Sequence, residues 1–141
     1  MWSPMGSLSR LERIAIVDRV CTEEMAKPYE PGASDCFILG VAIIDAMRGT
    51  SYRSDLSGAY QTIAGSQRAL RRRGHTSLIT FFPSLGLDRI PAGKCSPGDV
   101  VVTVVDRVEH VAVFTGSVFR SRSPDGPMNF RMGDVAAAFK V

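Results

Sequence analysis

The pattern of apolar residues changes character about two-thirds of the way along the chain. Up to residue 85 apolar positions recur near helical spacing, in stretches that Gly and Pro separate. After Pro97 they become β-branched or alternate with polar residues, which is typical of strands. Helices followed by an antiparallel meander predict an α+β fold, with the helices packed on a small antiparallel sheet.

The first part of the chain predicts a series of helices. They are expected over residues 7–26, 36–48, 57–64, 66–73 and 76–85, with loops over 50–57 and 87–97. The first is amphipathic, capped by Ser7 or Ser9 and ended by Pro28, and its Cys21 is expected in the core. The second is apolar almost throughout and begins at Cys36, directly after a loop rich in Pro and Gly.

The last part predicts strands. They are expected over residues 100–105, 109–115, 118–123 and 128–131, with a turn at 106–107 and a small closing helix over 133–139. The whole chain, 1–141, is expected to form one domain. Its parts are an N-terminal helix (1–26), a helical half with Cys36 (27–96) and a β-meander half with His110 (97–141).

Cys36 stands where a loop becomes a helix, and that position has chemical meaning. The first N–H groups of a helix lack partners and carry partial positive charge, so a thiolate there is stabilised. We expect the pKa of Cys36 to fall, with Ser34 or Asp35 capping the helix and free N–H groups available to an oxyanion. The alternative is an inert, buried cysteine that begins a core helix, and this stretch alone does not decide between the two.

A cysteine nucleophile needs a base, and the chain has two histidines. His75 follows a glycine in an apparent loop, whereas His110 opens a predicted strand, where a rigid scaffold holds it. The adjacent Glu109 should point to the opposite face. If the hairpin turns at residues 116–117, Ser123 falls opposite His110 and Ser121 shares its face, so either could orient the imidazole. The alternative for His110 is a solvated or structural strand histidine.

The composition argues against several classes of function but does not identify one. The net charge of +3, from 17 basic and 14 acidic residues, is too mild to argue for a nucleic-acid partner, and the basic run 71–73 favours a solvated helix end. Three cysteines without a CxxC pair or a His/Cys cluster indicate reduced thiols, and we expect no metal or cofactor. No apolar run reaches a membrane-spanning length, and the N-terminus lacks the apolar core of a signal peptide.

Two motifs resemble those of the NlpC-type cell-wall peptidases, a papain-like group. Residues 28–36, with Pro-Tyr, a glycine and then Asp35-Cys36, resemble the nucleophile motif. Residues 97–101 (PGDVV) followed by 110–116 (HVAVFTG) resemble the second motif, in which a histidine opens the strand after a Gly-Asp pair. From near Arg10 to the end the chain is similar to a phage and prophage branch of this superfamily, largely described as a domain of unknown function.

The resemblance implies a papain-like fold, Cys36 as nucleophile, His110 as base and a polar orienting residue on the next strand, where this chain offers only Ser121 or Ser123. It implies a cysteine hydrolase that cuts amide bonds of peptidoglycan stem peptides during cell entry. Partners would be other tail-tip proteins of a phage-type virion, which would carry a chain without its own signal. A rival expectation is a catalytically weak or inactive plug of the tail tip. A third is a cytoplasmic thiol-dependent amidase or acyltransferase.

Overall fold

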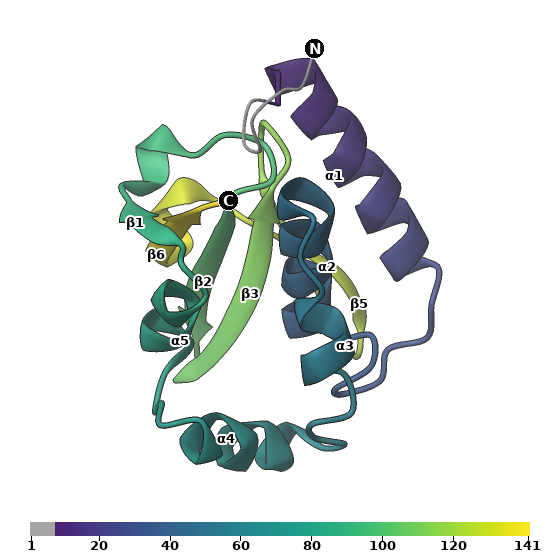
Figure 1. Ribbon diagram of the computed structural model, residues 1–141, viewed down its shortest axis with the longest axis vertical. Coiled ribbons are helices and arrows are strands. Elements are labelled where there is room, and N and C mark those ends of the chain that lie inside the picture. The colour runs from purple at the N-terminus through teal and green to yellow at the C-terminus, as the bar shows by residue number, and fades with distance from the viewer. Residues whose placement is uncertain (1–7) are drawn as a thin grey trace.

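The computed structural model of the protein describes residues 8–141, and within them the chain forms five α-helices and one six-stranded sheet. The helices are α1 (Arg10–Met25), α2 (Cys36–Arg48), α3 (Tyr52–Leu56), α4 (Ile63–Arg72) and α5 (Leu78–Ser84). The strands are β1 (Asp88–Ile90), β2 (Val100–Val105), β3 (Val108–Phe114), β4 (Phe119–Ser123), β5 (Gly126–Phe130) and β6 (Val135–Lys140). Figure 1 shows α1, α2 and α3 together on one side of β3.

All neighbouring strands are antiparallel, in the order β1-β6-β2-β3-β4-β5. The strands β2 to β5 follow one another as a meander, and β6 returns to pair with the other edge of β2. The β-branched run of β2 lies centrally between β3 and β6, with its first three valines fully buried. The predicted α+β class, with helices on an antiparallel sheet, is therefore confirmed.

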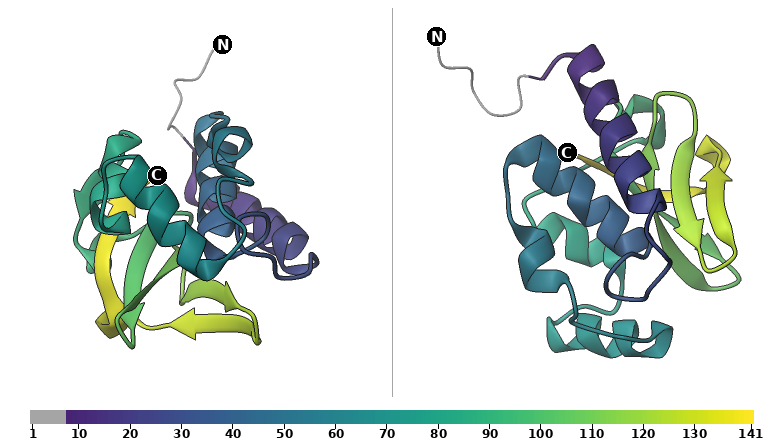
Figure 2. Two further views of the ribbon diagram at one scale, coloured as in Figure 1. Left: turned by 90° about the horizontal axis from the view of Figure 1, so that it is seen from below. Right: turned by 90° about the vertical axis from the view of Figure 1, so that its right-hand side faces the viewer.

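Helix α2 is apolar on nearly all sides because it contacts α1, α3 and β3. Figure 1 shows it between β3 and α1, and the right view of Figure 2, taken from the side of α1, shows α1 beside it. The helix approaches β3 closely at Gly40, where a Cβ would lie 2.6 Å from Cγ1 of Val111. Helix α1 lies outside α2 and begins at Ser9, whose side chain and that of Glu12 form a reciprocal capping box.

Each face of the sheet carries an apolar cluster. The larger cluster joins the helices to the sheet and includes Val111 and Val113 of β3, and Cys21 is buried in it as predicted. The smaller one lies on the opposite face and includes Ala112 of β3 and Phe130 of β5. Successive residues of β3 thus alternate between the two clusters. This alternation determines the face of the sheet toward which each side chain of residues 109–111 points.

The closing helix predicted over 133–139 is wrong. A single 3₁₀ turn, Met132–Asp134, precedes strand β6, whose residues 135–139 pair with β2 and β1. This short apolar run fits a buried strand and a buried helix equally well in isolation, and the free edge of β2 decides between them. The predicted loop 87–97 is also partly wrong, since it contains β1, which pairs with β6.

The helix predicted over 57–64 is misplaced as well. Helix α3 lies earlier, inside the predicted loop 50–57, because the carboxylate of Asp45 accepts the N–H groups of Tyr52 and Arg53 and so holds the start of α3. Residues 57–62 form turns instead, and α4 starts at Ile63 with Thr62 as its cap. None of the helices in the described part of the chain combines the length and apolar character needed to cross a membrane.

Candidate active site

The N-terminus of α2 is fixed by Asp35. One carboxylate oxygen accepts the N–H of Ile38 at 2.9 Å and the other accepts the N–H of Gly32 at 2.8 Å, together with the hydroxyl of Tyr60. Of the two predicted caps, Asp35 therefore has the role, and the Ser34 hydroxyl donates instead to the carbonyl of Pro28. Cys36 follows as the first residue of the helix.

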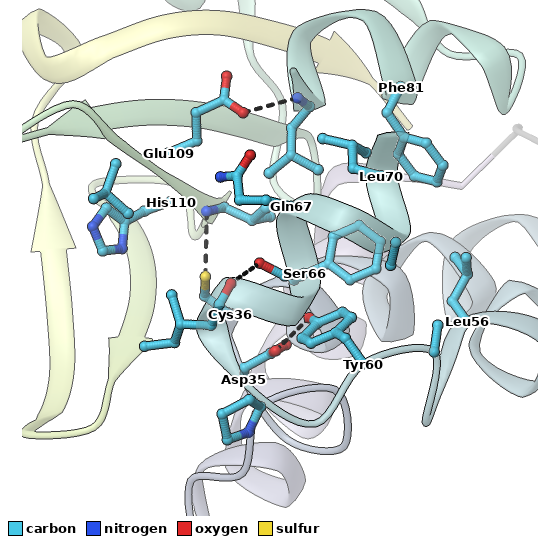
Figure 3. Close-up of a pocket in the computed structure, with 18 of the residues that line it drawn as sticks. Asp35, Cys36, Leu56, Tyr60, Ser66, Gln67, Leu70, Phe81, Glu109 and His110 are labelled. Carbon is cyan, nitrogen blue, oxygen red and sulfur yellow. Dashed lines mark hydrogen bonds between the residues drawn. The ribbon is translucent and has the colours of Figure 1, made fainter. Parts of the chain in front are cut away.

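The sulfur of Cys36 reaches a gap in the sheet. Strands β3 and β4 are paired only at Val113–Arg120 and Phe114–Phe119, so the ladder does not extend to Val111. The N–H of Val111 donates to the Cys36 sulfur at 3.5 Å, and its carbonyl accepts the Ser121 hydroxyl at 2.6 Å. Two side chains thus satisfy the backbone groups of Val111. Figure 3 shows the thiol directed at this N–H.

The expected lowering of the Cys36 pKa is wrong. Burial raises the pKa of the thiol to about 11, because the N–H of Val111 only partly offsets the loss of solvent and the carboxylate of Asp35 adds repulsion. The residue as a whole is half-buried, but its sulfur is enclosed between α2 and β3. The Ser121 hydroxyl lies near the thiol and favours ionisation, yet its one proton is already donated to Val111. Cys36 is therefore a neutral thiol at rest.

His110 lies on β3 beside this sulfur but on a different face of the strand. Its ring packs near that of Phe130, with centroids 6.1 Å apart, and burial lowers its pKa. The imidazole is therefore neutral near pH 7 and able to accept a proton. Among residues 8–141 no hydrogen bond joins the ring to Cys36 or to an orienting group.

The neighbours of His110 behave partly as expected. Glu109 turns to the helical face, where its carboxylate accepts the Ser77 hydroxyl at 2.5 Å and the N–H of Leu78 at 2.9 Å. Figure 3 shows the second of these bonds. Its predicted orientation away from His110 is confirmed. The Ser121 hydroxyl donates to the carbonyl of Val111, and the Ser123 hydroxyl donates within its own turn, to the carbonyl of Gly126 at 3.2 Å. Neither hydroxyl orients the imidazole in this structure.

Cys36 and His110 both line a pocket of about 170 Å³. Its walls come from the loop before α2, the start of α2, the segment 56–73 with α4, helix α5, and strands β3 and β4. Most of the lining is apolar. Its polar and ionisable side chains are Tyr29, Asp35, Cys36, Tyr60, Ser66, Gln67, Arg73, Glu109, His110, Arg122 and Ser123. The pocket is therefore a mostly apolar volume whose lining includes both Cys36 and His110.

The sequence predicts no role for three further residues of the pocket, Tyr29, Tyr60 and Arg122. Tyr60 lies in the stretch 57–64, for which the sequence predicts a helix, and burial raises the pKa of its hydroxyl, consistent with its role as donor to Asp35. Burial likewise raises the pKa of Tyr29 to about 12. Arg122 belongs to a predicted strand of alternating pattern, in which an arginine is usually expected to be exposed. Only the nearness of Tyr29 to the Asp35-Cys36 pair in the sequence was a usable signal.

Comparison with known proteins identifies the family but not an activity. The chain matches a family described as a domain of unknown function, DUF6950, over residues 10–141, and it belongs to that family. No curated protein and no solved structure matches it significantly.

Proposed function

We propose that the protein is a cysteine hydrolase with Cys36 as nucleophile and His110 as general base. The observation that carries this proposal is the hydrogen bond from Val111 to the Cys36 sulfur, because Val111 directly follows His110 in the chain. Cys36, at a helix start, and His110, on a strand, also both belong to the lining of one pocket, although 74 positions separate them in the sequence.

The resting state supports a particular order of events. Cys36 is protonated and His110 is neutral, so the thiol proton must pass to the imidazole as the sulfur attacks a carbonyl carbon. The new C–S bond gives a tetrahedral oxyanion, for which the N–H of Phe37 is available, since it donates to no group within residues 8–141. The imidazolium then protonates the leaving amine, and water hydrolyses the thioester.

Amide bonds of peptidoglycan stem peptides are the proposed substrate, and a phage-type tail during cell entry is the proposed setting. Both come from the resemblance of residues 28–36 and 97–116 to the NlpC-type motifs. The pocket supports a substrate with an apolar portion beside its reactive carbonyl, since most of its lining is apolar.

The experiment is release of new amino termini from purified peptidoglycan. Wild-type protein should release them, and Cys36→Ala and His110→Ala should lose at least about 10²-fold in rate, the usual contribution of a positioned acid-base group. His75→Ala is the matched control, because that histidine lies at Thr80 and Phe81 and outside the pocket lining. Equal rates for wild type and Cys36→Ala would end the proposal.

A second candidate function is an inactive structural component of a tail tip. It is favoured by the raised pKa of Cys36 and by the lack of a bond between His110 and either serine of β4. The two candidates separate in the assembled particle. A structural component predicts that Cys36→Ala particles stay infectious, whereas a hydrolase predicts normal assembly with impaired entry across the wall.

A further inference from the structure

Arg122 lines the same pocket as Cys36, and its buried guanidinium has no carboxylate partner among residues 8–141. Arg122 of β4 is only 7% exposed, and it contributes to the pocket wall. Two of its nitrogens donate to backbone carbonyls, of Glu24 at 2.7 Å and of Lys27 at 2.8 Å. Its Nε is buried and finds no partner within residues 8–141.

The neighbouring carboxylates are committed to other groups. Glu24 uses its side-chain oxygens for Arg53, at 2.7 and 2.9 Å, and for Lys27 at 2.7 Å. Asp35 uses its oxygens for two backbone N–H groups and for Tyr60. In the described part of the chain Arg122 therefore forms no ion pair. A buried charge destabilises the fold unless it is paired, and the guanidinium of Arg122 lacks the anion that would pair with it in this part of the chain.

Tyr29 connects this cation to the site of Cys36. The guanidinium lies over the Tyr29 ring, 5.6 Å from its centroid. Burial is the main cause of the raised pKa of Tyr29, and its phenol is also close enough to respond to Asp35, to Arg122 and to Cys36 when that thiol is ionised. Tyr29 thus lies against Arg122 and within electrostatic range of Cys36, and all three residues belong to the pocket lining.

We propose that Arg122, backed by Tyr29, forms a subsite for a carboxylate of the substrate in the pocket beside Cys36. A guanidinium binds a carboxylate through two N–H groups in a fixed geometry, and a desolvated pocket strengthens that contact. The subsite selects an acyl compound that carries a free carboxylate close to its reactive carbonyl. As a substrate subsite this inference rests on the proposed hydrolase function.

The test uses the thiol itself and needs no hydrolytic activity. Iodoacetate and iodoacetamide alkylate sulfur by the same displacement of iodide, and they differ in that iodoacetate carries a carboxylate. The rate for each reagent is measured at Cys36 by mass spectrometry of its peptide, in a Cys95→Ser background. Each rate is corrected for the thiolate fraction at the pH of the experiment and divided by the rate of N-acetylcysteine with the same reagent, corrected in the same way.

We expect Cys36 to prefer iodoacetate over iodoacetamide on the order of tenfold relative to the reference thiol, as the attraction of a buried cation would give. Arg122→Gln should abolish the preference, and Arg122→Lys should retain part of it. Arg73→Gln is the matched control, since it removes an exposed positive charge from the pocket lining and should leave the preference intact.

A wild-type protein without the preference overturns the proposal, and this reading does not depend on whether Arg122→Gln folds. A preference that survives in folded Arg122→Gln overturns it too. The outcome is separable from that of the hydrolase proposal. Loss of peptidoglycan cleavage in Cys36→Ala tests the reaction, whereas the two alkylating reagents test only the charge that Cys36 experiences.

Discussion

The hydroxyl of Tyr60 donates a hydrogen bond to the carboxylate of Asp35, the residue immediately before Cys36. The same carboxylate caps α2 and binds the N–H of Gly32. Asp35 therefore ties together the loop before α2, the helix itself and the turn that leads to α4. It is also a negative charge next to the thiol, and it contributes to the raised pKa of Cys36.

Asp35→Asn should lower the pKa of Cys36, because it removes that charge. The rate of Cys36 alkylation by iodoacetamide, followed against pH, should rise with a midpoint at about 11 in the wild type and at a lower pH in the variant. Asn caps a helix about as well as Asp, but its amide nitrogen cannot accept the N–H of Gly32 and the hydroxyl of Tyr60 as the second carboxylate oxygen does. The variant should therefore lose about 1–3 kcal/mol of stability, measured by urea denaturation. An unchanged or higher midpoint in Asp35→Asn would show that the carboxylate does not act on the thiol.

Gly32→Ala should destabilise the fold strongly. Gly32 has a φ of +80°, and a Cβ there would lie 1.9 Å from the backbone oxygen of Tyr60. Gly58→Ala is the matched control, with a φ of +78° and no atom within 4 Å of the added Cβ. The control should lose about 1–2 kcal/mol in urea denaturation, from backbone conformation alone. Gly32→Ala should lose clearly more, and equal losses would contradict the close approach.

Gly40→Ala should push α2 away from β3, because its Cβ would lie 2.6 Å from Cγ1 of Val111. The expected loss of stability is about 1–3 kcal/mol. Val111→Ala removes the obstructing methyl group and leaves a cavity, which costs stability by itself. The double variant should be more stable than the sum of the two single losses predicts. Strict additivity in urea denaturation would show that the two side chains do not meet.

His110 should set the acid limb of the pH dependence of kcat/KM, if the hydrolase proposal holds. Burial lowers its pKa from the ordinary value of 6.5, so the imidazole stays neutral, and basic, to a more acidic pH. The acid limb should therefore have its midpoint below 6.5 in the wild type and should be absent from the residual rate of His110→Ala. A midpoint above 6.5 would contradict the assignment.

Glu24→Gln should remove part of the acid sensitivity of the fold. Burial acts to raise the pKa of Glu24, but hydrogen bonds from Arg53 and Lys27 outweigh it and hold the pKa below 4.5. This carboxylate therefore stabilises the fold above pH 4.5, and that contribution is lost as the pH falls through the lowered pKa. At neutral pH the variant should lose about 2–3 kcal/mol in urea denaturation, and the loss should shrink as the pH falls.

Glu23→Gln is the matched control for this prediction. Glu23 lies one residue earlier in α1, and its pair with Arg19 at 3.8 Å is exposed to solvent. Exposed pairs contribute little, so the control should show nearly wild-type stability across the same pH range. A Glu24→Gln loss that is equal at acidic and neutral pH would mean that ionisation of Glu24 does not contribute.

The sequence predicted those features that depend on local patterns. The β-branched run 100–105 could only be a strand, and the Pro- and Gly-rich loop ahead of Cys36 correctly placed the start of α2. Alternation along β3 correctly sent Glu109 away from His110. The helix predicted over 133–139 is wrong because the apolar run 135–139 has no clear period, and the strand that decides its state, β2, is distant in the sequence.

The chemistry of the site was harder to predict than its location. The pKa of Cys36 depends on how completely β3 and α2 enclose its sulfur, which no spacing rule measures. The roles of Tyr60 and Arg122 depend on what lies opposite them, and those partners are 25 and 98 positions away. Ser121, predicted as a residue that could orient His110, donates its hydroxyl to the carbonyl of Val111 instead, a contact that the spacing along the strand does not reveal.

Because the Cys36 sulfur accepts the N–H of Val111, this backbone amide should report changes at the thiol. In most strands such an amide is held by another backbone and exchanges with deuterium only when the ladder opens. Here its acceptor is a sulfur atom that can be acylated, alkylated or displaced. The NMR resonance and the exchange rate of this one amide should therefore report each chemical state of Cys36 directly, without a substrate analogue or a dye.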